Sequence, residues 1–404
     1  MPSSHLVALA FAATITLPSL GAAQDPAPPK PPRGPEGVEF YAFDQSTLPP
    51  EGKPGDVIWW RPLAGVAALK AAGSNELVLY RSAATDEKQT PITVSGIIAL
   101  PPGSPPEGGW PVISWAHGTV GVGDKCAPSR DDEESLAHGI NKAPHPLLNA
   151  YLRKGWAVVM TDYEGLGTPR PHPFLLGHSE ARGILDMVRA AHKLHPGKLS
   201  KRFAIVGHSQ GGQAALFAAA DAKAWAPELE LRTVIALAPA SAIKPLFWLG
   251  VSGKEPSMGS AFIPLFLTGA IAGNPNIKPA ELLASPEMVR LFEEAEEKCR
   301  VELSLLDSWG GVIPNKVIRQ GANRVALDAQ LTAMHPGFLK ITAPVRLVQG
   351  AKDERVLPEQ TKVVKQQLID RKASVEYKEY PATDHFGVLN EDIAGSIDWL
   401  SNHP

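Results

Sequence analysis

The chain has 404 residues, of which 44% are hydrophobic and 20% are charged. This balance is ordinary for a globular protein that is long enough to bury a sizeable core. Its 39 basic and 42 acidic side chains leave a formal charge of −3 at pH 7. A charge so close to zero argues against nucleic acid or an anionic membrane surface as a partner.

The N-terminus has the features of an export signal. An apolar run over residues 6–20 gives way to small side chains at 21–23, which suits cleavage by a signal peptidase after Ala23. Pro18 interrupts this run, which is already shorter than the roughly 20 residues that span a bilayer. We therefore predict a signal peptide over residues 1–23 of a periplasmic or extracellular protein, with no stable membrane insertion.

A proline-rich segment comes next. Its composition over residues 24–37 predicts a stiff, extended linker, so ordered structure is expected from about Val38. Apolar runs at 56–60, 76–81 and 93–100 then predict strands. The last two runs have no helical pattern between them, which predicts an antiparallel start to the sheet.

Strands and helices alternate from about residue 111 onward. Strands are predicted at 112–116, 156–161, 203–206 and 233–238, and helices at 180–195 and 212–220. This alternation predicts a mostly parallel sheet covered by helices on both faces.

The motif Gly207-His208-Ser209-Gln210-Gly211 lies between a predicted strand and a predicted helix. The pattern G-x-S-x-G is short enough to occur by chance, but this context is the one that a nucleophile elbow requires. Glycines permit the tight turn, and the serine takes a strained backbone conformation. The alternative is a glycine-rich turn that carries an incidental serine.

The alternation stops over residues 241–335, which we predict to be a largely helical insertion with a charged helix at 279–299. An insertion at this point in the chain is expected to cover the site as a cap. Its aromatic side chains either bind substrate or form the core of the insertion. The residues predicted to bind substrate are Phe247, Trp248, Phe262 and Phe266.

Two candidate partners for Ser209 follow the later strands. A predicted strand at 345–350 leads into Asp353, and His385 stands between a predicted strand at 374–380 and a final helix. A serine hydroxyl needs a nearby base to act as a nucleophile. The order serine, acid, histidine is that of the α/β-hydrolase triad. We predict Ser209 as nucleophile, His385 as base and Asp353 as the carboxylate that orients the imidazole.

Each of these assignments has an alternative. Glu354 and Asp384 compete for the role of the acid, while His385 could be an ordinary surface histidine. Two further histidines lie nearby in the sequence or in the predicted fold: His208 adjoins Ser209 within the motif but would point elsewhere, and His117 belongs to another loop. No histidine has the spacing of a metal-ligand motif, so neither a metal nor a cofactor is predicted.

Acyl transfer develops negative charge on the carbonyl oxygen, which needs N–H donors. We predict the backbone N–H of Gln210 and that of Thr119, in the loop after the strand at 112–116. Glycines in this loop also spell G-x-x-G-x-G, but no helix follows them, so a nucleotide site is not expected.

The chain has two cysteines, Cys126 and Cys299. In an exported protein an isolated pair favours one disulfide, which would tie the loop after His117 to the insertion. Two buried free thiols are the alternative.

The stretch Trp115-Ala116-His117-Gly118-Thr119-Val120-Gly121-Val122-Gly123-Asp124-Lys125-Cys126-Ala127-Pro128-Ser129 resembles the secretory lipase family, which contains fungal lipase A enzymes and bacterial relatives. Similar motifs occur at 80–82, 94–96, 162–167 and 207–212. The resemblance implies an α/β-hydrolase core, a helical cap and hydrolysis of carboxylic esters.

The sequence as a whole predicts an α/β-hydrolase fold with its core in residues 38–240 and 336–404 and its cap in 241–335. The expected substrate is a small-molecule or lipid ester, hydrolysed through an acyl-enzyme, with at most transient contact with a lipid interface. A serine peptidase or amidase on the same fold is the main alternative, and a non-catalytic binding protein is the other.

Overall fold

The computed structural model describes Met1 and residues 30–403. The predicted signal peptide, apart from Met1, and residues 24–29 of the predicted linker lie outside the described residues. The fold is that of the unit that begins at Pro31. Residues 31–34, expected in the linker, already pair with the first strand, because the N–H of Gly34 donates to the carbonyl of Trp60 over 3.0 Å and that of Trp60 to Pro32 over 3.2 Å.

Nine strands form a single sheet in the order β1-β2-β3-β5-β4-β6-β7-β8-β9. Taken in this spatial order, the three neighbouring pairs from β1 through β3 to β5 are antiparallel. The five pairs from β5 through β4 to β9 are parallel. The predicted antiparallel start and mostly parallel sheet are thus confirmed. The strands are β1 (Val57–Pro62), β2 (Ser74–Ala83), β3 (Pro91–Leu100), β4 (Trp110–Ala116), β5 (Ala157–Thr161), β6 (Leu199–His208), β7 (Glu230–Leu237), β8 (Val345–Gly350) and β9 (Val375–Tyr380).

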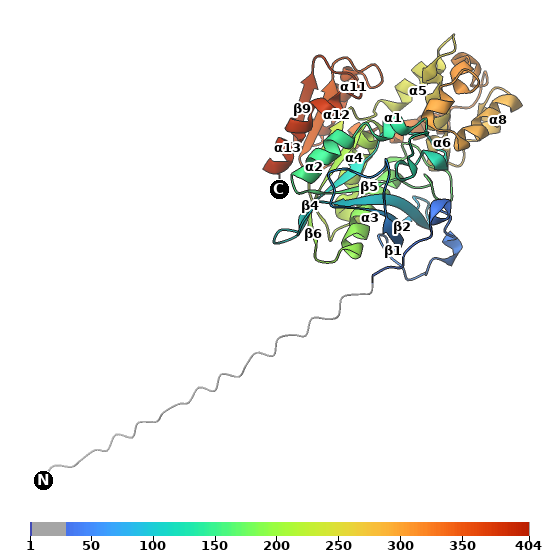
Figure 1. Cartoon of the computed structure of the whole chain (residues 1–404). Coiled ribbons are helices and arrows are strands. Elements are labelled where there is room, and N and C mark those ends of the chain that lie inside the picture. The colour runs from blue at the N-terminus through green and yellow to red at the C-terminus, as the bar shows by residue number, and fades with distance from the viewer. Residues whose placement is uncertain (2–29, 404) are drawn as a thin grey trace. The chain divides into compact units, whose positions relative to one another are not determined.

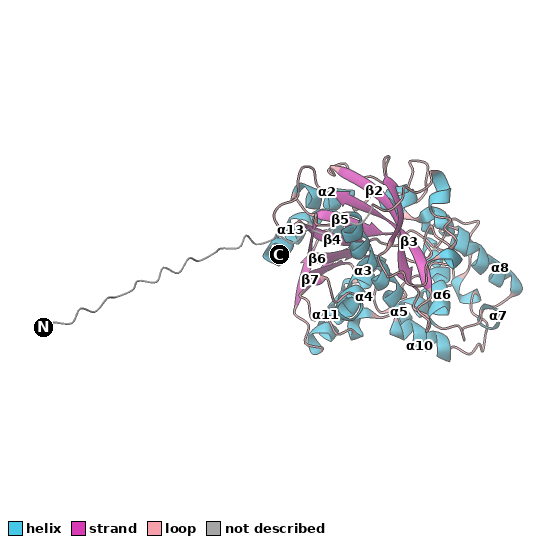
Figure 2. Cartoon of the chain, turned by 90° about the horizontal axis from the view of Figure 1, so that it is seen from below, coloured by secondary structure: helices cyan, strands magenta, loops and turns pink. Residues whose placement is uncertain are grey.

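Helices cover both faces of this sheet (Figures 1 and 2). One face packs against α3 (Gly177–Leu194), α4 (Gln210–Trp225) and α11 (Pro358–Asp370), through apolar side chains that form a single buried cluster. The other face packs against a shorter set in a second cluster. That set is α2 (His145–Arg153), α12 (Val388–Glu391) and α13 (Ile393–Asn402), with the short α1 (His138–Asn141) just before α2. No helix in the described part of the chain is both long and apolar enough to cross a membrane.

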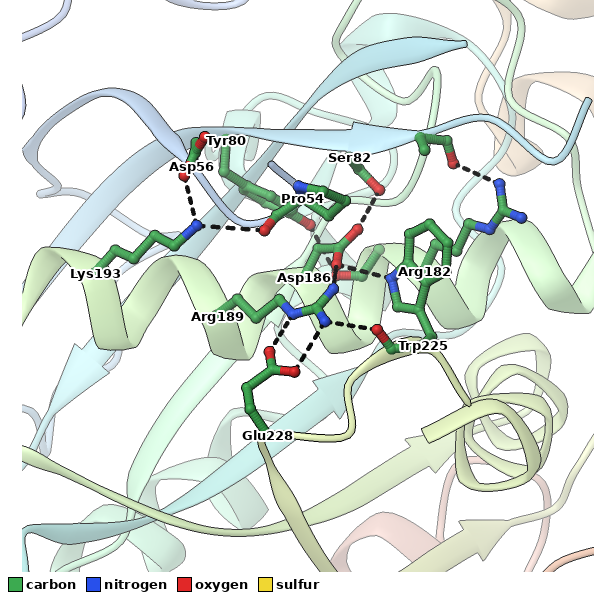
Figure 3. Close-up of polar contacts among 12 residues, drawn as sticks. Pro54, Asp56, Tyr80, Ser82, Arg182, Asp186, Arg189, Lys193, Trp225 and Glu228 are labelled. Carbon is green, nitrogen blue, oxygen red and sulfur yellow. Dashed lines mark hydrogen bonds and ion pairs between the residues drawn. The ribbon is translucent and has the colours of Figure 1, made fainter. Parts of the chain in front are cut away.

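A buried carboxylate fixes α3 to its neighbours (Figure 3). Asp186 accepts hydrogen bonds from the Ser82 hydroxyl of β2 over 2.7 Å and from the Trp225 indole of α4 over 2.9 Å. Arg189, one turn further along α3, donates to the same carboxylate over 2.9 Å and also pairs with Glu228. Burial nevertheless raises the pKa of Asp186 to about 6. The network therefore ties the long crossover helix to strand β2 and to the end of α4.

Residues 241–335 connect β7 to β8, and their apolar side chains form a third cluster. The single helix expected over 279–299 is broken, because Ala284 pairs with Val317 instead of continuing the turn. Ser285 then caps the next helix by accepting a hydrogen bond from the Met288 N–H over 3.3 Å. The helices of this segment are α5 (Ile243–Val251), α6 (Phe262–Gly273), α7 (Pro279–Leu282), α8 (Pro286–Glu294), α9 (Arg300–Leu303) and α10 (Val325–Ala333).

Candidate active site

Ser209 stands at the sharp turn between β6 and α4, with φ 58° and ψ −117°. This backbone conformation is strained for any residue with a side chain. Two glycines make the turn possible, because a Cβ on Gly207 would overlap the carbonyl of Gly211, and one on Gly211 would overlap that of Ala116. The turn therefore has the geometry of a nucleophile elbow. It holds Ser209 at the N-terminal end of a helix, where the helix dipole favours negative charge.

The structure brings His385 and Asp353 together from two different loops. The ring Nδ1–H of His385 donates to Asp353 Oδ2 over 2.7 Å, and both side chains are buried. A carboxylate can only accept, so the proton must lie on Nδ1, which leaves the Nε2 lone pair available as a base. Burial by itself would raise the pKa of the Asp353 carboxyl. The hydrogen bonds from His385 and from the backbone N–H groups of Val356 and Arg355 outweigh burial and hold that pKa below its usual value.

Gln349 helps to position the Asp353 carboxylate. The sequence did not indicate this role. The side-chain amide of Gln349 donates to Asp353 Oδ2 over 3.1 Å, and its own carbonyl accepts from the Thr361 hydroxyl over 2.7 Å. The two alternative acids lie elsewhere. Glu354 and Asp384 are both exposed, and the Asp384 carboxylate accepts a hydrogen bond from the Gly387 N–H over 2.7 Å.

The neighbouring histidines have other partners. The His208 ring donates from Nε2 to the backbone carbonyl of His385 over 2.8 Å, which helps to position the loop that carries His385. Burial, followed by the charge of His385, lowers the pKa of His208 to about 3. The His117 ring contacts the carbonyls of Gly118 and Asp162, and burial lowers its pKa to about 4. Both rings are therefore neutral at physiological pH.

Ser209 and His385 line a common cavity of about 340 Å³. Within the described part of the chain, the serine hydroxyl and the imidazole form no hydrogen bond with each other. Three of the four aromatic residues expected to bind substrate line this cavity, namely Phe247, Phe262 and Phe266.

Trp248 is absent from the cavity wall and lies on another side of α5. Its indole N–H donates to Asp328 over 2.7 Å, and Arg324 stacks on its ring at 4.4 Å from the centroid. Four other residues of α5 line the cavity, namely Leu246, Phe247, Leu249 and Gly250. At about 100° per residue, Trp248 lies on the side of the helix opposite to these four.

The two predicted oxyanion donors flank Ser209. Gln210 opens α4, and Thr119 lines the cavity together with Gly118. The loop approaches the nucleophile closely, because a Cβ on Gly118 would lie 3.7 Å from the Cβ of Ser209. Among the described residues, neither the Gln210 N–H nor the Thr119 N–H has a hydrogen-bond acceptor. Both donors remain free for a negatively charged oxygen.

The Gln210 side chain belongs to a buried cluster beneath the elbow. Its amide donates to Glu180 Oε1 over 2.7 Å and to the His172 ring over 3.0 Å. Glu180 also accepts the N–H of Leu175 over 3.0 Å. The sequence reasoning missed this cluster, although Glu180 stands four residues before Ile184 on the apolar face of its helix. A carboxyl in that position predicts a buried polar partner.

Glu180 gives stability a measurable pH dependence. Burial raises the pKa of its carboxyl from 4.5 to about 8. The folded protein therefore binds more protons than the unfolded chain between these values, and stability falls as the pH rises through that window. Between these pH values the free energy of unfolding of the wild type should fall, relative to that of Glu180→Gln, by up to about 1.4 kcal/mol for each pH unit. Urea unfolding of both proteins at several pH values measures this difference, and a constant difference would contradict the prediction.

Another buried carboxylate, that of Asp162, anchors the loop that carries Thr119. Asp162, which follows β5, accepts hydrogen bonds from the Ser95 hydroxyl over 2.6 Å and from the Ser129 N–H over 3.0 Å. The Ser129 hydroxyl also contacts this carboxylate. These contacts hold the end of the loop against the sheet and so fix the oxyanion side of the site.

A disulfide joins Cys126 to Cys299 and links the same loop to the segment 241–335. Backbone contacts reinforce the connection, because the N–H of Arg300 donates to the carbonyl of Val120 over 2.8 Å. The loop that carries Thr119 is thus covalently attached to the segment 241–335, and both contribute residues to the cavity wall.

Replacing both cysteines by serine should lower the free energy of unfolding by up to about 5 kcal/mol. The bridge spans 173 residues, so its removal frees a long loop in the unfolded chain. Urea unfolding of the oxidised wild type and the double variant measures the loss. A reducing agent should bring the wild type to the value of the variant and leave the variant unchanged. Equal stability of the oxidised wild type and the variant would refute the prediction.

No group of three or more histidine, cysteine, aspartate or glutamate side chains in the described residues could hold a metal ion.

Comparison with known proteins identifies the family of the chain. The sequence profile of the secretory lipase family matches residues 139–403. The chain belongs to this family. Within it, the chain is 35% identical to Lipase 7 of Candida albicans over 86 residues and 26% identical to Lipase A of Moesziomyces aphidis over 157 residues. These matches span 19% and 32% of the length of the two relatives, and 21% and 38% of this chain.

Solved structures confirm the α/β-hydrolase fold. Candida antarctica lipase A in its closed state superposes with a TM-score of 0.71 at 18% identity, covering 87% of this chain and 82% of that structure. A rice cell wall degrading esterase, LipA from Xanthomonas oryzae, superposes with a TM-score of 0.70 at 20% identity, covering 87% of this chain and all (100%) of that structure.

Proposed function

We propose that this secretory lipase family member is an exported carboxylic-ester hydrolase that uses Ser209, His385 and Asp353 through an acyl-enzyme intermediate. The observation that carries the proposal is the strained Ser209 elbow, which shares an apolar cavity with an imidazole held by a buried carboxylate. Membership of the family supports ester substrates, and the aromatic wall of the cavity suits an acyl chain.

In the first half-reaction the Ser209 hydroxyl oxygen attacks the ester carbonyl carbon, and His385 Nε2 takes the hydroxyl proton. The negative charge on the carbonyl oxygen is stabilised by the free N–H groups of Gln210 and Thr119. The imidazolium, stabilised by Asp353, then gives its proton to the departing alcohol oxygen. This step leaves the acyl group on Ser209.

In the second half-reaction water attacks the acyl carbon while His385 accepts a proton from it. Collapse of the second tetrahedral intermediate breaks the bond to Ser209, whose oxygen recovers the proton from the imidazolium. The carboxylic acid product is released, and the site returns to its starting protonation state.

The arrangement of the chain supports further parts of the proposal. Residues 38–240 and 336–404 form the catalytic core, and residues 241–335 act as a cap that supplies part of the cavity wall. Residues 1–23 act as a signal peptide, and residues 24–37 as a linker. The disulfide and the family both favour an oxidising compartment outside the cytoplasm.

A panel of p-nitrophenyl esters of rising acyl length, measured beside aminoacyl p-nitroanilides, tests this function. We expect turnover of the esters and little or none of the anilides. Faster turnover of the anilides would favour a peptidase or amidase. Absence of turnover in both series, with folding verified by circular dichroism, would favour a non-catalytic binding protein.

A further inference from the structure

Two arginines line the cavity that contains Ser209. Arg300 begins α9 in the cap segment, and Arg355 lies in the loop after β8, two residues beyond Asp353. Neither guanidinium forms an ion pair with any carboxylate of the residues that the structure describes. By contrast, Arg189 pairs with both Asp186 and Glu228. The cavity therefore contains two cations that the protein itself does not neutralise.

Both arginines are attached to fixed backbone. The N–H of Arg300 donates to Val120, and the preceding residue is the disulfide-bonded Cys299. The N–H of Arg355 donates to Asp353 Oδ1 over 2.8 Å, and its guanidinium stacks on Phe386 at 5.1 Å from the ring centroid. One cation thus comes from the cap and the other from the core. Such fixed placement reduces the entropy lost when a ligand binds.

The charges around the pair leave it positive. Burial, and then the positive charge of Arg355, lower the pKa of Arg300 to about 10, so Arg300 remains a cation at neutral pH. Two carboxyl groups also line the cavity. That of Asp131 already has partners, because its oxygens accept hydrogen bonds from His138 Nδ1 over 2.7 Å and from Asn141 Nδ2 over 3.0 Å. The other, Glu354, is exposed and forms an ion pair with neither arginine.

Arg300 is partly buried, and uncompensated positive charge in such a place is costly unless an anion offsets it. Arg355 is exposed and contributes the second positive charge. A guanidinium binds a carboxylate through paired, charge-assisted hydrogen bonds, and two guanidinium groups bind it more strongly than one. The aromatic residues of the cavity wall, Phe247, Phe262 and Phe266, offer no such partner. The cavity thus combines an apolar surface for a hydrocarbon chain with a cationic surface for a charged group.

We propose that Arg300 and Arg355 form an anion-binding subsite that selects esters carrying a free carboxylate in the acyl or the alcohol part. The proposal rests on the proposed function, because it concerns the substrate of that same site. The two guanidinium groups attract the carboxylate of the bound substrate. Loss of either group should therefore raise KM for the anionic ester more than it lowers kcat.

Two matched pairs of esters test the subsite. The acyl pair is the mono-p-nitrophenyl ester of adipic acid and p-nitrophenyl hexanoate, which differ by a carboxylate in place of a methyl group. The alcohol pair is the butyrate ester of p-hydroxybenzoate and that of p-hydroxybenzamide. Each ester is measured with the wild type, Arg300→Gln, Arg355→Gln and Arg290→Gln. The last is a control, because Arg290 is an exposed arginine of the same segment with a side-chain exposure of 69%.

In at least one pair the wild type should prefer the anionic ester, and high salt should weaken this preference. Arg300→Gln and Arg355→Gln should each lower kcat/KM for that ester by about tenfold or more, while the neutral ester and the control variant change little. Equal losses for the anionic and neutral esters, or no losses, would overturn the subsite. If the wild type hydrolyses none of the four esters, the proposed function itself is wrong.

Discussion

Asp353→Asn is expected to lower kcat for ester hydrolysis by a factor of about 10³–10⁴ with little change in KM. The amide oxygen can still accept the backbone N–H groups of Arg355 and Val356, which the carboxylate accepts over 2.8 and 3.0 Å. The amide NH₂ then faces His385 Nδ1 and can only donate. It therefore favours the tautomer with the proton on Nε2, in which the ring cannot accept the proton of Ser209.

The alternative acids provide the controls for this variant. Asp384→Asn and Glu354→Gln should each change kcat by less than about threefold, because both side chains are exposed and neither contacts the imidazole. Steady-state kinetics on p-nitrophenyl butyrate compares all three variants. Near wild-type kcat in Asp353→Asn, together with a large loss in either control, would move the role of the acid to another residue.

Ser209→Ala should have the largest effect, a loss of about 10⁵–10⁶ in kcat, because no other group can form the acyl-enzyme. The residual rate would come from the oxyanion donors and from substrate binding alone. Folding should be unaffected, since alanine meets the same backbone strain at φ 58° as serine does. The thermal unfolding midpoint is therefore expected to stay within a few degrees of the wild-type value.

Ser241 offers a matched control for the serine substitution. It is a buried serine in the loop after β7, and its hydroxyl has no hydrogen-bond partner within the described structure. Ser241→Ala should leave kcat nearly unchanged. If Ser241→Ala abolishes ester turnover while Ser209→Ala retains it, the nucleophile has been assigned to the wrong residue.

Features encoded by local pattern could be predicted from the sequence. The apolar runs of the strands and the glycine spacing around Ser209 follow from backbone geometry over a few residues. The placement of Asp353 and His385 after later strands follows from the order of a parallel sheet. The helix α2 on the second face of the sheet was missed, because Pro144 and Pro146 are typical of a loop. In the structure Pro146 lies in the first turn of α2, where proline is tolerated.

Features that depend on which face of an element is buried could not be predicted in the same way. Asp186 and Asp162 look like solvent-facing charges in the sequence, yet each is buried and accepts hydrogen bonds from other buried side chains. Trp248 was expected to bind substrate beside Phe247, but its side chain points to another side of the same helix, where the indole N–H donates to Asp328. The cation pair in the cavity joins segments about fifty residues apart, and its lack of carboxylate partners is visible only in three dimensions.

Labelling with a fluorophosphonate, followed by peptide mapping by mass spectrometry, tests the central claim most directly. The reagent forms a stable adduct only with a serine that is activated by a neighbouring base. We predict one adduct per chain, on the peptide that contains Ser209, with much slower labelling of Asp353→Asn and none of Ser209→Ala. A wild-type protein that hydrolyses esters but carries no adduct on Ser209, or carries it on another residue, would contradict the account.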